Sequence, residues 1–318
     1  MKFIPGLLFT SSIAILALLA GSSIGLLGGV ANALVLGLLL RNLGIYKKSF
    51  DPGVTFSEKS ILSLAIILIG INLDATALSR FEPATILLVV SAILMAMVLA
   101  LIIGKAFGYS RKNRLLIGVG TAICGSSAIA ATAPMITDDE GDIGISIAVV
   151  NLLGVAGIFL LPLLARAFDL SVFGEGLLVG SSLQAVGHVV AAGYSLSDAT
   201  GDFAVVVKMG RVALLLPLVL LLRIASPDQG SLRGALPNYL LGFALMATIS
   251  SLGLVPAEAK QFISFAGKLA LAISMAAIGL NINLQKFLSQ GPKMLGYAAV
   301  VSFFHVSFIL LAILFIGA

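Results

Sequence analysis

Long runs of apolar residues recur along the whole chain, and few polar residues interrupt them. A helix needs about 20 such residues to cross the roughly 30 Å hydrocarbon core of a bilayer. The pattern therefore predicts an all-α polytopic membrane protein with about eleven transmembrane helices. They lie near 4–20, 22–40, 60–73, 84–104, 114–136, 143–165, 176–195, 203–222, 236–254, 262–282 and 294–316. The third segment is short, and we expect it to extend into its flanks.

One polar pattern occurs twice within these apolar segments. KSILSLAIILIGIN (59–72) and KLALAISMAAIGLN (268–281) align without a gap, 209 residues apart, with Lys, Gly and Asn recurring in frame. Leu43-Gly44 and Leu252-Gly253 keep the same separation. A repeat gives a membrane protein two near-equivalent conformations, which is typical of transporters. We therefore expect a single transporter domain over 1–318, with a first repeat at about 1–136 and a second at about 174–318.

Composition and charge agree with this interpretation. With 59% hydrophobic and 10% charged residues, the chain has more apolar surface than a soluble fold could bury. The net charge of +5 reflects topology rather than nucleic-acid binding, because thirteen of the nineteen Lys and Arg residues fall in alternate loops and two on the opposite side. This bias predicts a cytoplasmic N-terminus, a C-terminus outside and an antiparallel arrangement of the two repeats.

Residues 1–20 also fit a cleavable signal peptide, since Lys2 precedes an apolar run. A second apolar segment follows at once, which favours a hairpin of two retained helices. The single cysteine, Cys124, can form neither an intramolecular disulfide nor a metal cluster of cysteines. We therefore expect no metal and no cofactor.

The fifth segment contains the first candidate site. GVGTAICGSSAIAATAPM (118–135) concentrates glycine, hydroxyl groups and Pro134 in mid-span, which weakens a continuous helix. A broken membrane helix exposes N–H and C=O groups that can bind an ion, and a half-helix starting near Ser126 suits an anion. Small residues for close helix packing are the simpler alternative. The proposed ligands are Cys124, Gly125, Ser126 and Ser127.

The seventh segment is the second candidate. In GSSLQAVGHVVAAG (180–193), Gln184 and His188 are four residues apart and so would share a helical face. An intramembrane histidine either belongs to a proton or anion site or is a neutral packing residue.

Lys208 and Arg211 are the third candidate, at the start of the eighth segment. Three residues apart, they would lie on one face and create a positive potential for an anion. Snorkelling to the headgroups is the alternative. It is also the favoured interpretation of Lys59 and Lys268, which we place at span starts.

Three asparagines are secondary candidates. Asn72 and Asn281 could be ligands or end-of-helix residues, and Asn151 is polar in an apolar segment. The deepest carboxylates we expect are Asp74 and Glu175, both near span ends.

Several function classes are disfavoured. The sequence has no G-x-x-x-x-G-K-[ST] and no H-E-x-x-H, so we expect neither an ATPase nor an enzyme.

Three stretches carry a resemblance to a known family. ICGSSAIAATAPMI (123–136), VGHVVAAG (186–193) and VVKMGRV (206–212) resemble, in order, signature stretches of the YeiH family of bacterial membrane proteins, described as sulfate exporters. The family is grouped with the cation–proton antiporter and anion transporter superfamily. The resemblance implies an inverted-repeat fold with discontinuous helices. The family pattern carries a His-Glu pair where Gln184 and Ala185 stand, which implies a difference in ion coupling.

These observations lead to one hypothesis with two rivals. We expect a secondary transporter in the bacterial inner membrane that moves a small anion, such as sulfate or another sulfur oxyanion, by alternating access. A cation–proton antiporter and a non-transporting scaffold or receptor subunit are the alternatives. The expected partners are the anion, the lipid bilayer, and a proton or sodium ion for coupling, with no nucleic acid. A homodimer is a further expectation.

Overall fold

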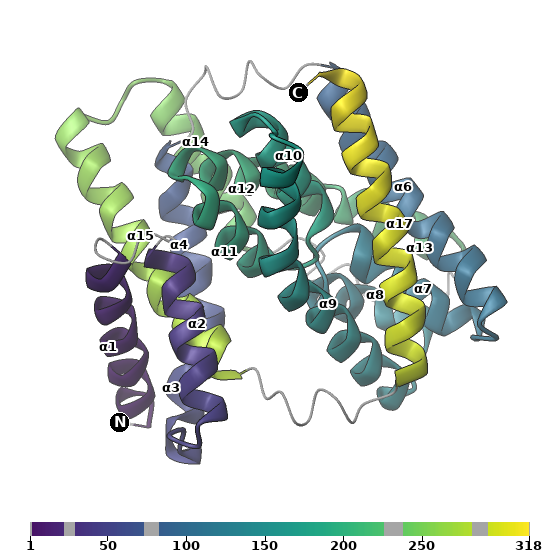
Figure 1. Ribbon diagram of the computed structural model, residues 1–318, viewed down its shortest axis with the longest axis horizontal. Helices are drawn as coiled ribbons and strands as arrows, with labels where there is room; N and C mark the ends of the chain where they lie inside the picture. Colours follow the sequence, from purple (N-terminus) through teal and green to yellow (C-terminus); the bar gives the residue numbers. More distant parts are fainter. Residues whose placement is uncertain (1, 22–28, 73–82, 226–237, 282–291, 318) are drawn as a thin grey trace. The chain divides into compact units, whose positions relative to one another are not determined.

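The computed structural model describes residues 2–21, 29–72, 83–225, 238–281 and 292–317 (Figure 1). Within these ranges the regular structure is helical, and each of the eleven predicted segments coincides with helix. Six helical segments are long and apolar enough to cross a membrane, and shorter apolar helices accompany them. The all-α membrane class is therefore confirmed. The third segment does extend into its flanks, as a run of short helical elements over Lys48–Asn72.

The chain forms two compact units, and each unit takes residues from both halves of the sequence. Unit 1 comprises Met1–Arg80, Val190–Asp202 and Asn238–Leu288, and unit 2 the remaining segments. The helices mainly in unit 1 are α1 (Ile4–Gly21), α2 (Gly29–Asn42), η1 (Lys48–Phe50), α3 (Asp51–Phe56), η2 (Ser57–Ile61), α4 (Leu62–Ile69), η3 (Gly70–Asn72), α14 (Asn238–Ser251) and α15 (Ala257–Asn281).

Unit 2 contains the remaining long helices. They are α6 (Pro83–Ala106), α7 (Arg111–Ala122), α8 (Ser126–Ile136), α9 (Glu140–Ala167), α10 (Val172–Ser182), α13 (Leu215–Ala225) and α17 (Pro292–Ile316). Helices α11 (Val186–Leu196) and α12 (Asp198–Ala213) contribute residues to both units. The limits of the single domain and of its two repeats stay a prediction.

The sequence repeat is also a repeat of helix boundaries. Helix α14 has the length of α2 and lies 209 residues after it, and α15 has the same relation to the run from Lys48 to Asn72. Gly44 and Gly253, at the same separation, both have a left-handed backbone, with φ of 79° and 67°. Glycine adopts this conformation at no steric cost, which explains its recurrence at both helix ends.

Helix crossings in unit 1 repeat in the same way. Gly279 of α15 packs on the backbone carbonyl of Leu34 in α2, and Gly70 of η3 packs on that of Phe243 in α14. A Cβ at either glycine would overlap that carbonyl. Leu34 and Phe243 are themselves 209 residues apart. The same close crossing is thus made twice, as a pseudo-twofold relation between the copies requires.

The two copies of the repeated segment run antiparallel. Gly267, near the middle of α15, lies against Leu68 and Ile69 of α4, whereas Asn281 at the end of α15 bonds to Glu58 in η2. Residue numbers rise along one element as they fall along its neighbour. Within unit 1, this geometry agrees with the antiparallel repeats expected from the charge pattern.

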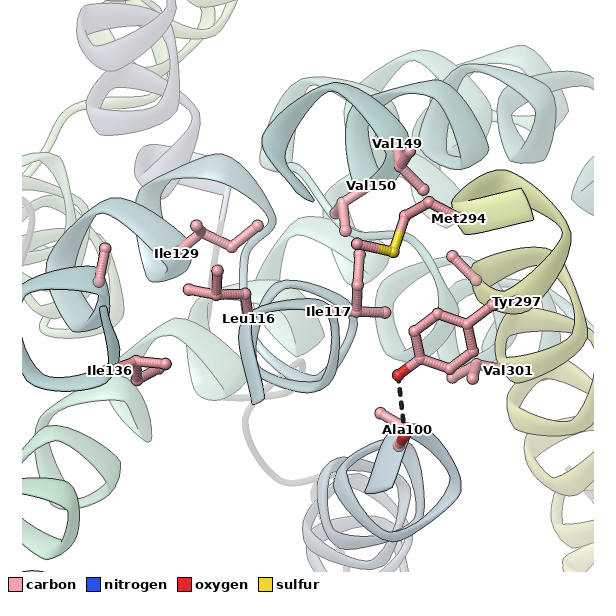
Figure 2. Close-up of a cluster of buried hydrophobic side chains, with 12 residues drawn as sticks. Ala100, Leu116, Ile117, Ile129, Ile136, Val149, Val150, Met294, Tyr297 and Val301 are labelled. Carbon is pink, nitrogen blue, oxygen red and sulfur yellow. Dashed lines mark hydrogen bonds between the residues drawn. The ribbon is translucent and has the colours of Figure 1, made fainter. Parts of the chain in front are cut away.

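Unit 2 has a dense apolar cluster at the junction of five helices (Figure 2). Side chains of α6, α7, α8, α9 and α17 meet there, among them Ile117, Val150 and Val301. Tyr297 donates a hydrogen bond to the carbonyl of Ala100 across 2.8 Å, which joins α17 to α6. Because lipid is as apolar as leucine, such clusters hold membrane helices together by close packing and hydrogen bonds rather than by the hydrophobic effect.

The outward faces of the long helices are strongly apolar. Leu87 and Ile102 on α6 and Phe303 and Leu311 on α17 are each more than 60% exposed. A soluble protein rarely presents apolar patches of this kind, whereas a bilayer solvates them. These faces are suited to lipid.

Candidate functional site

The fifth segment is broken in mid-span, as predicted. Helix α7 ends at Ala122 and α8 begins at Ser126, so three residues, including Cys124, lie between them. Gly125 immediately precedes α8 with φ of 69°, a conformation that favours glycine. The sequence hypothesis of a half-helix starting near Ser126 is therefore confirmed.

The seventh segment is broken as well. Helix α10 ends at Ser182, Leu183 has an extended backbone, and α11 begins at Val186. Gln184 lies in this break rather than on α11, so the expectation that Gln184 and His188 share a helical face is wrong. A Cβ on Gly125 would be 3.5 Å from the Cβ of Gln184. The two breaks therefore face each other.

Lys208 joins the two breaks. Its Nζ donates to the carbonyl of Ile123, at 2.5 Å, and to that of Leu183, at 2.6 Å. Ile123 follows the last residue of α7, and Leu183 follows the last residue of α10. Carbonyl groups at such helix ends have no hydrogen-bond donor within their own helix. One ammonium group thus satisfies the ends of α7 and α10 together.

Arg211 binds the same two helix ends through all five of its N–H groups. Its guanidinium donates to Thr121 and Ala122 of α7 and to Gly180 and Leu183 of the α10 end, with N···O distances between 2.6 and 3.1 Å. The planar fork of arginine allows such multiple bonding, which a lysine could not reproduce. Arg211 therefore has no N–H left for a ligand and acts on one through its charge.

The depth of these two cations differs from the sequence expectation. Helix α12 begins at Asp198, which makes Lys208 its eleventh residue and places it about 15 Å along the helix axis. Both side chains are fully buried. They lie in mid-span rather than near its start, which excludes snorkelling for either residue.

The positive charge at the breaks exceeds the negative charge that surrounds it. Each half-helix C-terminus contributes about −0.5 of an elementary charge, so the two ends offset about one of the two positive charges. Within the part of the chain that the structure describes, neither Lys208 nor Arg211 forms an ion pair with a carboxylate. About one positive charge is left over, which is the condition for binding an anion.

Cys124 of the first break and the first two residues of α8 differ in exposure. Cys124 is buried, Ser126 is half-buried and Ser127 is exposed. The hydroxyl of Ser127 donates to the carbonyl of Cys124 at 3.2 Å, and its Oγ lies 3.0 Å from the Cys124 Sγ. The first N–H groups of α8, with the positive end of its dipole, also lie here.

The second break contributes buried polar groups. Gln184 is 4% exposed, and its Oε1 has no hydrogen-bond partner among the described residues. The imidazole of His188 packs against Gly154 of α9, where even a methyl group would overlap it. Asn151, half-buried, lies one turn before Gly154 on the same face of α9. The geometry thus gives His188 a packing contact, and its role as a proton or anion ligand stays a prediction.

A cavity of about 410 Å³ lies beside the second break, within unit 2. Apolar residues of α9 and α17 make up most of its wall, and its polar members are Ser182, Gln184, Ser302 and Ser307. Apolar walls give an anion few partners. We therefore place the candidate anion site at the facing breaks and not in this cavity.

The secondary candidates Asn72 and Asn281 are not part of this site. Both belong to unit 1, where Asn72 donates to Asp202 at 3.1 Å and Asn281 donates to Glu58. Asp202 and Glu58 are thus carboxylates inside candidate spans. The expectation that Asp74 and Glu175 are the deepest acids is wrong in this respect, and Asp74 lies outside the described residues.

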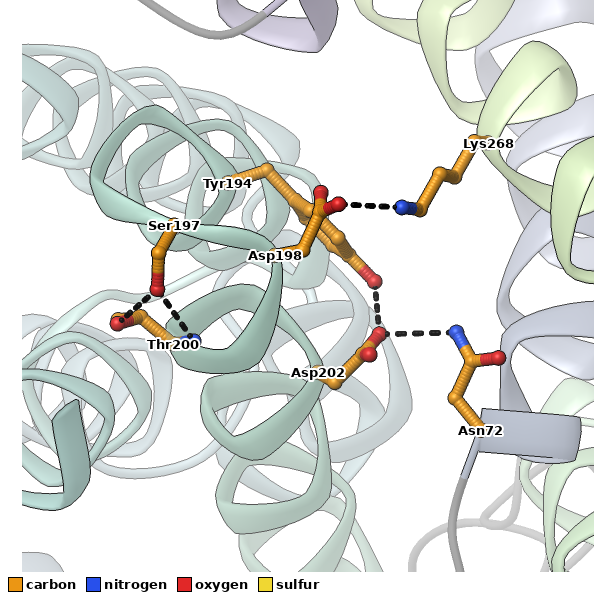
Figure 3. A network of polar contacts seen from close by, with 7 residues as sticks. All are labelled: Asn72, Tyr194, Ser197, Asp198, Thr200, Asp202 and Lys268. Atoms are coloured by element: carbon orange, nitrogen blue, oxygen red, sulfur yellow. Dashed lines mark hydrogen bonds and ion pairs between the residues drawn. The ribbon is translucent and has the colours of Figure 1, made fainter.

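The repeated lysines also differ from expectation. Lys59 and Lys268 are each the twelfth residue of a 25-residue segment, not its start. Lys268 forms an ion pair with Asp198 at 2.6 Å (Figure 3). The recurrence of Lys and Asn in the repeat was the sequence signal for these contacts, but it did not reveal their carboxylate partners.

Comparisons with known proteins agree with the resemblance. A family model described as "Conserved hypothetical protein 698" matches residues 5–298. The chain belongs to this family. The family includes proteins named "UPF0324 membrane protein": one from Clostridium tetani is 29% identical over 99% of this chain and 96% of its own length, and one from Lactiplantibacillus plantarum is 31% identical over 95% and 94%. A relative from Paracoccus pantotrophus, named "UPF0324 membrane protein TauZ", is 33% identical over 81% of this chain and 80% of its own.

Proposed function

We propose that this membrane protein is a secondary transporter of a small anion, sulfate or another sulfur oxyanion, across the cytoplasmic membrane. One observation carries the proposal: Lys208 and Arg211 are fully buried at two facing helix breaks without a carboxylate partner in the described residues. A buried uncompensated charge is costly in a membrane, and an anion removes that cost. The proposal assigns transport rather than catalysis to the chain.

The proposed anion lies between the first N–H groups of α8 and the second break. Ser126, Ser127 and Gln184 would supply hydrogen bonds, and Lys208 has one N–H beyond the two that bind carbonyls. Arg211 would fix the positions of the two helix ends and add positive potential. The repeated architecture supplies the two conformations that alternating access needs.

Ligand-induced stabilisation of purified protein tests the proposal. We expect sulfate, sulfite or a sulfonate to raise the melting temperature, because a ligand that binds only the folded state stabilises it. Carboxylates and Na⁺ complete the panel. Lys208→Met, which removes the charge at similar length, should abolish the ligand-induced shift. Lys105→Met, an exposed lysine of the same unit, should keep it.

Anion flux into proteoliposomes then separates transport from binding. The proposal expects Lys208→Met to lose uptake of the stabilising anion and Lys105→Met to retain it. An unchanged ligand-induced shift and unchanged flux in Lys208→Met would overturn the proposed site. Stabilisation by Na⁺ alone would favour the cation–proton antiporter. If no ligand raises the melting temperature of the wild type and the wild type transports no anion, a scaffold or receptor subunit would be favoured.

A further inference from the structure

A carboxylate of unit 1 lies in a neutral hydrogen-bonding pocket (Figure 3). Asp202 is half-buried on the second turn of α12 and accepts hydrogen bonds from the phenol of Tyr194 in α11 and the amide of Asn72 in η3. Tyr194 is itself buried, with its ring packed on Gly201. The pocket is therefore preformed around one carboxylate, within a candidate span.

The charges around Asp202 do not balance. Asp198 lies one helical turn earlier on α12, and Lys268 of α15 forms its ion pair with Asp198. Tyr194 and Asn72, the groups that face Asp202 from α11 and η3, are neutral donors. Among the residues that the structure describes, two carboxylates and one ammonium leave one negative charge. A single proton on Asp202 makes the cluster neutral.

The cluster suits a proton better than a metal cation. Hard cations such as Ca²⁺ and Mg²⁺ require a shell of oxygen ligands. Here an O–H and an N–H point at Asp202, and the Lys268 ammonium occupies the other carboxylate. The described residues contain no group of three His, Cys, Asp or Glu side chains that could hold a metal.

The second copy of the repeat builds a related arrangement. Glu58 of η2 accepts a hydrogen bond from Asn281, the repeat equivalent of Asn72. Lys59, the repeat equivalent of Lys268, adjoins Glu58 in sequence. Because α4 and α15 are antiparallel, Asn72 and Asn281 lie toward opposite ends of this pair. Asp202 therefore has Asn72 of the first copy and Lys268 of the second copy nearby. Glu58 has Asn281 of the second copy and Lys59 of the first.

We propose that Asp202 is a proton-binding site that couples anion transport to the proton gradient, with Glu58 as its counterpart at the other end of unit 1. The proton adds to a carboxylate oxygen of Asp202, and the exposed side chain of Asp198, one turn away, marks the side from which it would enter. Coupling rests on the proposed anion transport, whereas proton binding at Asp202 does not. Helix α12 carries both Asp202 and the cations Lys208 and Arg211, so one helix links the two sites.

Infrared spectroscopy of the purified protein tests proton binding without any transport. Lowering the pH should produce a C=O stretching band of a protonated carboxyl group that Asp202→Asn lacks. Glu258→Gln, an exposed carboxylate of α15, should keep the band. Tyr194→Phe removes a donor that favours the ionised carboxylate, so its band should appear at higher pH than in the wild type. This variant retains the aromatic ring and covers the case in which Asp202→Asn does not fold.

Flux in proteoliposomes tests the coupling. An inward proton gradient should accelerate anion uptake by the wild type and by Glu258→Gln, and this acceleration should be lost in Asp202→Asn, which should still exchange anion for anion at equal pH. A band that persists in Asp202→Asn together with unshifted Tyr194→Phe would overturn proton binding. Gradient-driven uptake that persists in Asp202→Asn would overturn the coupling. A wild type without flux of any oxyanion overturns the proposed function instead, and the infrared result still decides whether Asp202 binds a proton.

Discussion

At the scale of single residues, Arg211 and Lys208 show how a buried cation can be stabilised without a carboxylate. Their partners are backbone carbonyls at two helix ends, groups that would otherwise lack hydrogen bonds in the membrane. The two residues have different roles, because all N–H groups of Arg211 bind carbonyls, whereas Lys208 retains one N–H for a ligand. Stability and anion affinity should therefore respond differently to changes at the two positions.

Arg211→Ala should lower the stability of the protein. The carbonyls of Thr121, Ala122 and Gly180 would lose the N–H donors that Arg211 supplies, at a cost of about 3 kcal/mol or more in unfolding free energy. Arg211→Lys keeps the charge and should be destabilised to a smaller degree while retaining the anion-induced shift. Thermal unfolding in detergent measures both variants. Equal stability of Arg211→Ala and the wild type would contradict the role of Arg211 as a cap of both helix ends.

Gly125 is the residue that allows α8 to start where it does. Its φ of 69° costs other residues about 1 kcal/mol or more, so Gly125→Ala should destabilise the protein by that amount. Gly210→Ala is the matched control, because a Cβ there meets nothing within 4 Å and Gly210 lies inside a helix. Alanine favours helix, so we expect Gly210→Ala to be neutral or stabilising in the same unfolding measurement. An unfolding free energy of Gly125→Ala equal to that of the wild type would contradict this role of Gly125 at the helix break.

At the scale of elements, the sequence predicted the breaks but not what holds them. Glycine and serine in mid-span weaken a helix locally, so Gly125 and Ser126 carried a readable signal. The carbonyl partners of Arg211 are 28 to 90 residues away, and a single sequence gives no measure of such contacts. The acids were missed for another reason. Hydropathy placed the start of the eighth span at Phe203, yet α12 begins at Asp198, where polar partners in unit 1 bind its carboxylates.

The repeated glycine crossing gives a prediction at this scale. Gly279→Ala should disrupt the crossing of α15 with α2, because the added methyl overlaps the Leu34 carbonyl and backbone atoms cannot move aside locally. We expect a loss of about 1 to 3 kcal/mol, the range for overpacking. Gly296→Ala in α17 is the control, since nothing lies within 4 Å of its added Cβ. Chemical unfolding measures the unfolding free energy of both variants. Equal values for Gly279→Ala and Gly296→Ala would contradict the tight crossing.

At the scale of the whole molecule, the two units separate two kinds of polar chemistry. Counted over the described residues, unit 2 holds an excess of positive charge at the helix breaks, whereas the Asp202 cluster of unit 1 holds an excess of negative charge. The apolar pattern and the repeat predicted a polytopic inverted-repeat protein. The interleaving of the two units was not predictable, because it depends on which helices pack together and not on where each begins and ends.

Each of the two carboxylate sites joins residues from both halves of the sequence. Asp202 takes its asparagine from the first half of the sequence, and Glu58 takes its own from the second half. A protein consisting of one half alone would leave each carboxylate without its amide donor. The two halves therefore cannot be separated without breaking both sites, which makes the joined chain the smallest unit that can contain them.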